Sequence, residues 1–306
     1  MNSINIWEKV IESYREVKSE KYLGIFGNPV KHTLSPIIHD TISDELSLGE
    51  RYIPFEIDEN LGDCVRSAFE NGIIGLNVTV PYKEKVIPFL SDIDSDAKRI
   101  GAVNTLVRTP KGFKGYNTDM EGLYRSIEEA GMRIKDNEII MLGAGGAARA
   151  VAYMCKKYGA KKVYIINRSY EKAEKLAVDM NETDTGMEEK KREAIFFPVE
   201  AAGYNNIPTG KYMFIQCTSI GLKEEDGLPL IDDKNFYRQA VCAVDLIYNP
   251  QKTCFIKLMD EYGIKAINGL KMLLYQGIIA NEYWNKIKID NILAEKIYKK
   301  LETKFD

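Results

Sequence analysis

The 306-residue chain has very few histidines, only His32 and His39. A reaction that uses histidine as its acid or base therefore has few candidates, and we expect another proton carrier. The five cysteines are scattered without a Cys-X-X-Cys pair, which is typical of reduced, buried thiols rather than of disulfides or a metal site. We therefore assign no metal to the chain.

Long apolar runs and an excess of basic residues are also missing. No stretch approaches the roughly 18 apolar residues of a membrane span, and the polar start lacks the apolar region of a signal peptide. The formal net charge of −3, with 42 basic against 45 acidic residues, offers no basic stripe for nucleic acid and no polybasic patch for a membrane. With 45% apolar and 28% charged residues, the chain is expected to be a cytoplasmic globular protein that acts on small molecules.

The most informative stretch is residues 139–149, which reads IIMLGAGGAAR. Its apolar start predicts a buried parallel strand, and Gly143, Gly145 and Ala148 occupy the small-residue positions of a Gly-X-Gly-X-X-Gly/Ala nucleotide-binding turn. Gly143 permits the turn, Gly145 allows a pyrophosphate to approach the backbone, and Ala148 lets the next helix pack closely. An ordinary strand-to-helix turn is the alternative, so the neighbouring segments must decide.

Strands and helices alternate along the chain. In the first part we expect strands at residues 22–27, 51–57, 73–80, 104–109 and 112–116, of which the last two form a hairpin. We expect helices at 4–18, 61–71 and near 91–100, and one that begins at Pro81. A further helix is expected from Ser35-Pro36, with Ser35 as its N-cap. In the second part we expect strands at 139–142, 162–167, 194–199, 212–217, 241–247 and 264–267, helices from Asp119, up to 157, to about 180, at 270–288 and at 291–303, and a polar surface loop at 181–192.

The pattern predicts an α/β protein with two domains. Residues 1–118 would form a mostly parallel α/β domain for substrate binding and catalysis, with residues 269–306 packing back on it. Residues 119–268 would form a Rossmann-like, doubly wound nucleotide-binding domain.

The choice of cofactor follows from the end of the second strand after the glycine turn. NAD sites place an acidic residue there for the ribose hydroxyls, but this strand ends in Asn167-Arg168-Ser169. A cation suits a 2′-phosphate, and Lys172 adds a second positive charge. The sequence therefore favours NADP, the alternative being a solvated helix start that happens to be basic.

Lys83 and Asp119 are the candidates for chemistry. Lys83 lies after a strand, in the first turn of a predicted helix, where the helix dipole disfavours a cation unless a carboxylate is near. Asp119 follows another predicted strand. Such a pair would deliver a proton to a carbonyl oxygen as hydride arrives at its carbon, whereas a solvated lysine is the alternative from spacing alone.

A series of motifs occurs in one order between about residues 24 and 277: GNPVKHTLSPIIH, GLNVTVPYKE, GAVNTLV, YNTD, GAGGAARA, NRS, CTSIGL, DLIYNP and NGLKMLLYQG. In number, order and spacing they resemble the signatures of the shikimate dehydrogenase family. The resemblance implies reversible, NADP-dependent reduction of 3-dehydroshikimate to shikimate on the route to chorismate and the aromatic amino acids. It also implies a two-domain fold whose last helices return to the substrate domain.

Carried over position by position, the resemblance assigns Lys83 and Asp119 as the catalytic pair, with Lys83 the general acid or base. The implied substrate ligands are Asn77, Asn104 and Gln276 for the ring hydroxyls, Thr33, Ser35 and Tyr248 for the carboxylate, and Thr79 as a further hydroxyl. The implied cofactor contacts are Gly143, Ala144, Gly145, Gly146, Ala147, Asn167, Arg168, Ser169, Lys172, Thr218 and Gly269. Without the resemblance, Thr33 and Ser35 would be interpreted as helix caps, Gln276 as an ordinary polar helix residue, and both histidines are interpreted as structural.

Three residues depart from the family pattern. Thr33 stands where serine is most common, Gln216 replaces the usual asparagine before Cys217, and Asp40 follows His39 where asparagine is common. The methyl group of Thr33 leaves the choice between shikimate and quinate open.

Two rival functions are compatible with the same motifs. One is a quinate/shikimate dehydrogenase of the same fold, with NAD as a candidate cofactor, and the other is a non-catalytic NADP-binding sensor, against which the intact Lys83 and Asp119 argue. The sequence leaves monomer and homodimer equally open.

Overall fold

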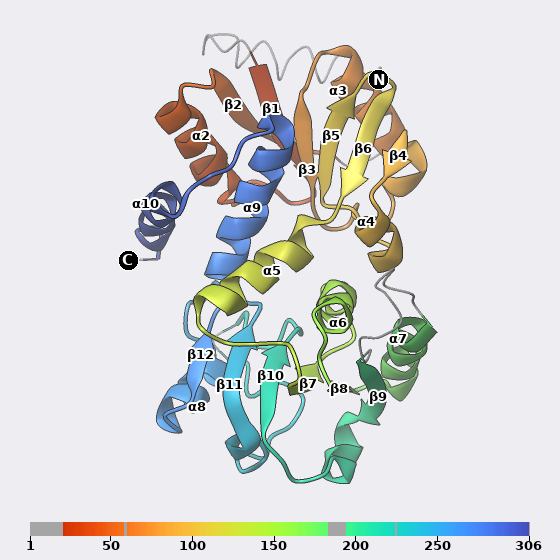
Figure 1. The fold of residues 1–306 in the computed structure, drawn as a ribbon, viewed down its shortest axis with the longest axis vertical. Coiled ribbons are helices and arrows are strands. Elements are labelled where there is room, and N and C mark those ends of the chain that lie inside the picture. Colours follow the sequence, from red (N-terminus) through yellow and green to blue (C-terminus); the bar gives the residue numbers. More distant parts are fainter. Residues whose placement is uncertain (1–20, 58–59, 183–193, 224, 306) are drawn as a thin grey trace. The chain divides into compact units, whose positions relative to one another are not determined.

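The computed structural model describes residues 21–57, 60–182, 194–223 and 225–305. The expected helix at 4–18 and most of the expected loop at 181–192 lie outside this part of the chain. The chain divides into two compact units: unit 1 contains residues up to Asp119 and residues 274–304, and unit 2 contains residues 120–273 with Phe305. Each unit holds one six-stranded sheet, which confirms the prediction of an α/β protein with two mostly parallel sheets (Figure 1).

The sheet of unit 1 has the strand order β2-β1-β3-β5-β6-β4. Its strands are β1 (Lys21–Gly27), β2 (Glu50–Glu56), β3 (Gly75–Val78), β4 (Asp92–Ile93), β5 (Thr105–Thr109) and β6 (Gly112–Tyr116). β1 pairs in parallel with β2 and β3, whereas β5 pairs antiparallel with β3 and β6, which confirms the hairpin. Among the described residues before Thr118, the other elements are α2 (Ser35–Leu46), α3 (Leu61–Glu70), η1 (Ile87–Phe89) and α4 (Ser95–Ile100).

The helix expected from Pro81 is wrong. Residues 81–86 form turns, and in the fully described stretch from Pro81 to Ser91 the short η1 is the only helical element. The backbone carbonyl of Lys83 accepts a hydrogen bond from the N–H of Val103 at 2.8 Å. That carbonyl is therefore engaged by another segment and does not serve a helix of its own.

The helix expected near 91–100 is correspondingly shorter. Residues 92–93 form β4, and α4 begins only after Asp94, whose carboxylate accepts a hydrogen bond from the N–H of Asp96 at 2.9 Å and caps the helix.

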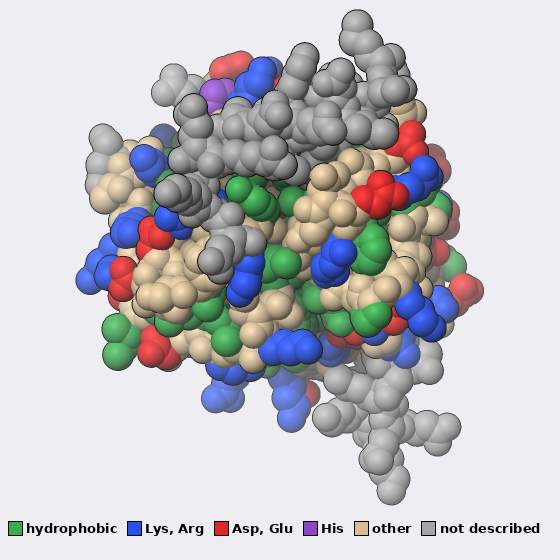
Figure 2. Space-filling view, turned by 90° about the horizontal axis from the view of Figure 1, so that it is seen from above, with side chains coloured by type: hydrophobic (Ala, Val, Ile, Leu, Met, Phe, Trp, Pro, Cys, Tyr) green, Lys and Arg blue, Asp and Glu red, His purple; other side chains and the backbone are tan. Residues whose placement is uncertain are grey.

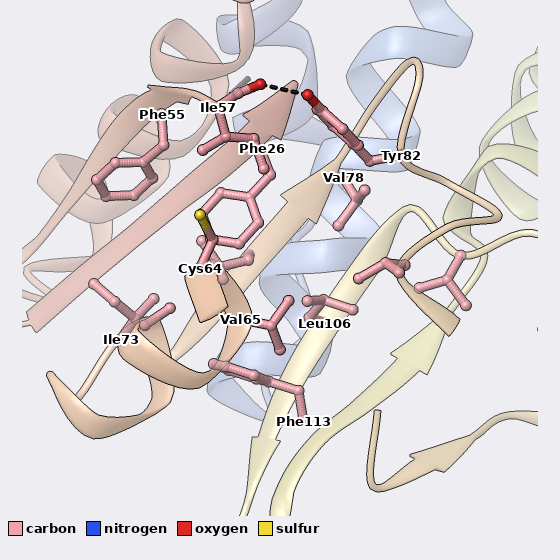
Figure 3. Close-up of a cluster of buried hydrophobic side chains, with 14 of the residues drawn as sticks. Phe26, Phe55, Ile57, Cys64, Val65, Ile73, Val78, Tyr82, Leu106 and Phe113 are labelled. Atoms are coloured by element: carbon pink, nitrogen blue, oxygen red, sulfur yellow. Dashed lines mark hydrogen bonds between the residues drawn. The ribbon is translucent and has the colours of Figure 1, made fainter. Parts of the chain in front are cut away.

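An apolar core fills the space between the sheet of unit 1 and α3. Phe26, Ile53 and Val78 from three neighbouring strands meet Val65 of α3 in this core, and all four are at most 4% exposed. Figure 3 shows Phe26, Val65 and Val78 in this cluster. The core fixes the carboxyl ends of β1 and β3, which are followed in the chain by Thr33, Ser35, Thr79 and Lys83.

The C-terminal helices α9 (Leu270–Asn285) and α10 (Asn291–Glu302) contact the earlier part of unit 1. The indole N–H of Trp284 donates to the carbonyl of Leu106 at 2.9 Å, and Lys296 pairs with Glu45 at 2.6 Å. α10 lies beside α2, where Lys300 donates to Thr41 (Figure 1). Residues far apart in the sequence thus complete one unit.

The sheet of unit 2 is entirely parallel and has the order β12-β11-β10-β7-β8-β9. Its strands are β7 (Glu138–Leu142), β8 (Lys162–Asn167), β9 (Ile195–Glu200), β10 (Tyr212–Gln216), β11 (Ala240–Asp245) and β12 (Lys265–Ile267). The connecting elements are α5 (Thr118–Glu129), α6 (Ala148–Lys157), α7 (Tyr170–Glu182), η2 (Ala201–Asn206), η3 (Phe236–Gln239) and α8 (Cys254–Glu261). The first strand, β7, lies between β8 and β10, so the winding reverses at β7, which is the doubly wound arrangement.

The core of unit 2 consists of apolar residues of the central strands, and Ile140, Phe214 and Ala243 are fully buried in it.

On the face shown in Figure 2, which is seen from above the view of Figure 1, lysine and arginine side chains are scattered among acidic and uncharged ones. Within the described residues, no helix is both long and apolar enough to cross a membrane.

Candidate active site

Lys83 and Asp119 form a close ion pair in unit 1. The Lys83 Nζ lies 2.6 Å from the Asp119 Oδ2. The side chains are 30% and 16% exposed, so the pair is sheltered but open to a small molecule. The predicted carboxylate partner of Lys83 is thus present, although the helix from which its need was argued is absent.

Local contacts hold both members of the pair. Next to Lys83, the Tyr82 hydroxyl donates to the carbonyl of Ile57 and ties the turn to the core (Figure 3). Asp119 lies in the first turn of α5, where the helix dipole stabilises a carboxylate. Its backbone N–H donates to the Asn117 side chain at 3.2 Å, which is anchored in turn on the carbonyl of Ala102.

Asn77 and Asn104 belong to one buried hydrogen-bond network in unit 1. Asn77 ends up 4% exposed on β3, and Asn104, just before β5, is 3% exposed. The Asn77 Nδ2 donates to the carbonyl of Asn104 at 3.2 Å. The structure therefore brings these two expected substrate ligands together.

Thr33 and Ser35 lie at the start of α2. The prediction of Ser35 as the N-cap is wrong, because the helix begins at Ser35 itself and Leu34 occupies the cap position without a capping side chain. Thr33 takes over part of this role: its Oγ1 accepts a hydrogen bond from the N–H of Ser35 at 3.2 Å and donates to the Ser35 hydroxyl at 3.1 Å. The two hydroxyls are thus adjacent, as a common anionic ligand would require.

The other expected substrate ligands are distributed over both units. Thr79 follows β3, and Gln276 is buried on α9, both in unit 1. Tyr248 belongs to unit 2, where burial raises the pKa of its hydroxyl and its ring contacts Phe305 edge-on.

The glycine turn of unit 2 has the backbone that the sequence predicts. Gly143 has a φ of +106°, which favours glycine, and a Cβ there would lie 2.8 Å from the Thr218 methyl carbon. A Cβ at Gly145 or Gly146 would meet nothing within 4 Å. α6 begins after Ala147, which has no side chain that could cap the helix, and the N–H of Ala148 donates to the carbonyl of Gly145 at 3.1 Å.

Asn167 connects this turn to the basic segment after β8. Its Oδ1 accepts from the N–H of Ala144 at 3.3 Å, and its Nδ2 donates to the carbonyl of Ser169 at 2.9 Å. Arg168 and Lys172 are exposed. Sequence reasoning missed Glu171, whose carboxylate accepts from the Ser169 hydroxyl at 2.7 Å and has its pKa lowered by that bond.

Gln216, a departure from the family pattern, organises the loop after β10. It is fully buried, its Oε1 accepts from the N–H of Thr218, and its Nε2 donates to the carbonyl of Ile220 at 2.9 Å. Gly269 is equally constrained, because a Cβ there would lie 2.1 Å from the carbonyl oxygen of Leu246. Thr218 and Gly269 thus lie on rigid loops of unit 2.

Asp40, a further departure from the family pattern, also has a local partner. Its Oδ1 accepts a hydrogen bond from the backbone N–H of Tyr52 at 3.0 Å, a role that an asparagine oxygen would fill equally well.

No group of three or more potential metal ligands occurs within the described part of the chain.

Comparisons with known proteins agree with this geometry. Residues 25–106 match the model of the shikimate dehydrogenase substrate binding domain, and residues 125–193 match that of shikimate / quinate 5-dehydrogenase. The shikimate dehydrogenase (NADP⁺) of Desulforamulus reducens is 41% identical over 271 residues, which cover 85% of this chain and 88% of that protein. The chain belongs to the shikimate dehydrogenase family.

Solved structures of this family share the fold. A chorismate mutase/shikimate 5-dehydrogenase fusion protein from Clostridium acetobutylicum superposes with a TM-score of 0.82 at 34% identity, covering 94% of this chain and 99% of that chain. Shikimate 5-dehydrogenase from Thermus thermophilus, in complex with NADP(H) and shikimate, gives a TM-score of 0.77 at 26% identity, covering 92% and 99%. Both resemblances extend over the two units.

Three buried residues that contact the expected family residues were not identified from the sequence. Tyr52 of β2, Thr105 of β5 and Thr118 of α5 all hydrogen-bond to Asn77 or Asn104. They come from distant positions in the chain, and the pairing of β1 with β2 and β3 and of β3 with β5 brings them together.

Proposed function

We propose that this chain catalyses the reversible, NADPH-dependent reduction of 3-dehydroshikimate to shikimate. The observation that carries the proposal is the Lys83–Asp119 ion pair, 2.6 Å long and only partly exposed, in a chain of this family. In this role the enzyme is an NADP-dependent oxidoreductase that acts on a CH–OH group and supplies the chorismate pathway to the aromatic amino acids.

Lys83 is the general acid in the direction of reduction. Its ammonium group donates a proton to the substrate oxygen while hydride reaches the carbon of that carbonyl, and it takes the proton back in the reverse direction. Asp119 keeps the ammonium group in place and balances its charge. The pair thereby lowers the cost of a developing alkoxide.

The residues of unit 2 fit NADP. Space lies open above Gly145 and Gly146, and the uncapped start of α6 suits a pyrophosphate. Arg168 and Lys172 suit a 2′-phosphate after a strand that ends in Asn167 rather than in an acidic residue. On binding, the Ser169 hydroxyl would exchange its hydrogen bond to Glu171 for one to the phosphate. When bound, NADPH supplies the hydride.

The proposed substrate contacts match the chemistry of shikimate. Thr33, Ser35 and Tyr248 provide hydroxyl donors for its carboxylate, while Asn77, Asn104 and Gln276 provide amides for its ring hydroxyls, with Thr79 as a further hydroxyl. We further propose that unit 1 is the substrate domain and that unit 2 is the NADP domain.

A cytoplasmic location is part of the proposal. The five cysteines are free thiols in the structure, which fits a reducing compartment. The choice between monomer and homodimer is left to sedimentation or light scattering of the purified chain.

One spectrophotometric screen tests the proposed function. Shikimate and quinate are each oxidised with NADP⁺ and with NAD⁺ at matched concentrations, and the rise of the reduced nicotinamide band is followed. We expect shikimate with NADP⁺ to give by far the highest kcat/KM. A higher value for quinate with NAD⁺ would establish the rival quinate dehydrogenase, and no turnover with any pair, despite NADP⁺ binding, would establish the non-catalytic sensor.

A further inference from the structure

Behind the proposed substrate ligands lies a buried polar network that includes a tyrosine with no assigned role. Tyr52 is 4% exposed, and Thr105 and Thr118 are completely buried. Their hydroxyls connect to the amides of Asn77 and Asn104. Because the amides of asparagine can face either way, the network decides which atom of each amide remains for a ligand.

The orientation of the Asn104 amide is fixed by the backbone. The N–H of Thr118 lies 2.8 Å from the Asn104 Oδ1, and since a backbone N–H can only donate, the oxygen must be on this side. The hydroxyls of Thr105 and Thr118 occupy the same oxygen at 3.0 and 3.1 Å. The Nδ2 has no hydrogen-bond partner among the described residues, so Asn104 retains a donor.

Asn77 is fixed in the opposite sense. Its amide faces the backbone carbonyl of Asn104 at 3.2 Å, and because a carbonyl can only accept, the Nδ2 must lie there. Its second N–H is directed to the Thr105 hydroxyl at 3.1 Å. Both donors of Asn77 are therefore engaged, and only its oxygen retains capacity for a ligand.

Tyr52 completes this arrangement from β2. Its hydroxyl lies 2.7 Å from the Asn77 Oδ1 and must donate to it, which leaves one lone pair of that oxygen. Burial raises the pKa of Tyr52 well above its usual range, so the phenol keeps its proton. The ring stacks on His39 with centroids 4.3 Å apart, and Trp284 lies against both rings.

We propose that Tyr52 is a positioning residue that fixes the hydrogen-bonding polarity of the substrate site, with Asn104 as the donor and Asn77 as the acceptor. This inference rests on the proposed function. It follows that Asn77 recognises a hydroxyl and does not bind a keto oxygen, which has no proton to give. The keto oxygen of the oxidised substrate is left to donors, of which the Lys83 ammonium is the proposed proton source.

The test compares the full-length wild-type chain with Tyr52→Phe, Asn77→Ala and the double variant. We expect Tyr52→Phe to raise the KM for shikimate about tenfold while it changes the KM for NADP⁺ less than twofold. In the Asn77→Ala background the same change should alter the KM for shikimate less than twofold, because Tyr52 acts through that amide. Tyr22→Phe, on the neighbouring strand β1, is the matched control and should behave like the wild type.

A second variant tests the polarity without touching Tyr52. Asn104→Asp keeps the shape of the side chain but replaces the Nδ2 donor by an oxygen, so we expect the KM for shikimate to rise at least 100-fold with the affinity for NADP⁺ retained. Asn104→Ser, which restores a donor, should recover part of this loss.

Three results separate the possible failures. An unchanged KM in Tyr52→Phe, or equal effects of that change in both backgrounds, overturns the positioning role while the wild type remains active. Wild-type affinity in Asn104→Asp overturns the assigned polarity. A wild-type chain that does not oxidise shikimate overturns the proposed function, and this inference with it.

Discussion

At the scale of single residues, the candidate chemistry depends on how Lys83 is held. Its backbone carbonyl is bound by Val103, and its neighbour Tyr82 is anchored on Ile57, so the turn is fixed on both sides. The side chain is left with one close carboxylate, Asp119, and with partial exposure. Such a lysine can exchange a proton with a ligand without any rearrangement of the backbone.

The first prediction removes this ammonium group. Lys83→Ala should lower kcat for shikimate oxidation at least about 100-fold, the usual contribution of a general acid or base, while NADP⁺ still binds through unit 2. Steady-state kinetics give kcat, and quenching of the intrinsic fluorescence gives the Kd for NADP⁺. Lys85→Ala removes an exposed lysine two positions on and serves as the control. A kcat within a few-fold of the wild type would remove Lys83 from the mechanism.

The second prediction concerns the buried carboxyl of Asp245. Burial raises its pKa from an ordinary 3.8 to about 6, against the hydrogen bonds from Thr253 and Ile247. Between pH 3.8 and pH 6 the folded chain binds more protons at this group than the unfolded chain does. The contribution of the protonated group to the free energy of unfolding is therefore full below pH 3.8 and is lost as the pH rises through 6.

Asp245→Asn should remove this dependence. Between pH 4 and pH 7 the free energy of unfolding of the wild type should fall relative to that of the variant by about 2–3 kcal/mol, measured by urea denaturation at each pH. Thr253→Val keeps the carboxyl but removes a hydrogen bond that lowers its pKa, so the fall of stability with pH should be at least as large as in the wild type. Parallel curves for wild type and Asp245→Asn would show that the carboxyl titrates alike in both states.

At the scale of elements, two glycines of unit 2 contrast in what surrounds them. At Gly145, in the turn before α6, an added methyl group would have no atom within 4 Å, whereas at Gly269 it would lie 2.1 Å from the backbone carbonyl oxygen of Leu246. One glycine thus leaves space for something that binds, and the other allows two segments of the chain to touch.

The third prediction uses this contrast. Gly145→Ala should leave the midpoint of thermal unfolding within about 2 °C of the wild type. It should lower the affinity for NADP⁺ at least tenfold, because the methyl group occupies the space proposed for the pyrophosphate. Gly269→Ala should lower the free energy of unfolding by about 1–3 kcal/mol or more, because the backbone at Leu246 has to move away from the added methyl group. Gly227→Ala, in an exposed loop with open space, is the control. Undiminished NADP⁺ affinity in Gly145→Ala would contradict the assignment of the turn.

Elements that rest on local signals could be predicted from the sequence. The glycine turn, the hairpin of β5 and β6 and the strands of unit 2 lie within one or two residues of the expected positions, since apolar runs, glycines and prolines act over short distances. The helix expected from Pro81 failed because Val103, about twenty residues away, takes up a carbonyl that a local helix would need. Boundaries set by such distant partners carry no local signal.

The same limit applies to the site. The pairing of Lys83 with a carboxylate could be inferred from chemistry, and the resemblance supplied the other positions. The roles of Tyr52 and Thr118 could not be inferred, because they depend on which atom of an amide faces a given backbone group. That information exists only once β2, β3 and β5 are paired in register.

At the scale of the whole molecule, the chain forms two compact units, each with a sheet and an apolar core of its own. Unit 1 recruits α9 and α10 from the far end of the sequence, through Trp284 and Lys296. Unit 2 is a continuous doubly wound sheet. Because the proposed substrate ligands lie almost all in unit 1 and the proposed NADP ligands lie in unit 2, each ligand should stabilise mainly its own unit.

The fourth prediction tests these roles by amide hydrogen exchange followed by mass spectrometry. A ligand at 100 times its Kd stabilises the unit that it binds by about 2.7 kcal/mol, which slows exchange through opening of that unit about 100-fold. NADP⁺ should protect β7, the glycine turn and residues 167–172, and shikimate should protect β3, β5 and the start of α2. The segment around Tyr248 is the part of unit 2 that should also respond to shikimate.

Two variants make the assignment specific. Arg168→Ala should abolish most of the protection by NADP⁺ at a fixed concentration and leave that by shikimate unchanged, because the lost guanidinium serves only the 2′-phosphate. Asn104→Asp should do the reverse, since it keeps the oxygen that accepts from Thr118, removes the donor for the substrate and changes no group near the glycine turn. Shikimate protection that maps to the glycine turn, or NADP⁺ protection that maps to β3 and β5, would reverse the roles of the two units and would require the proton donor to be sought outside the Lys83–Asp119 pair.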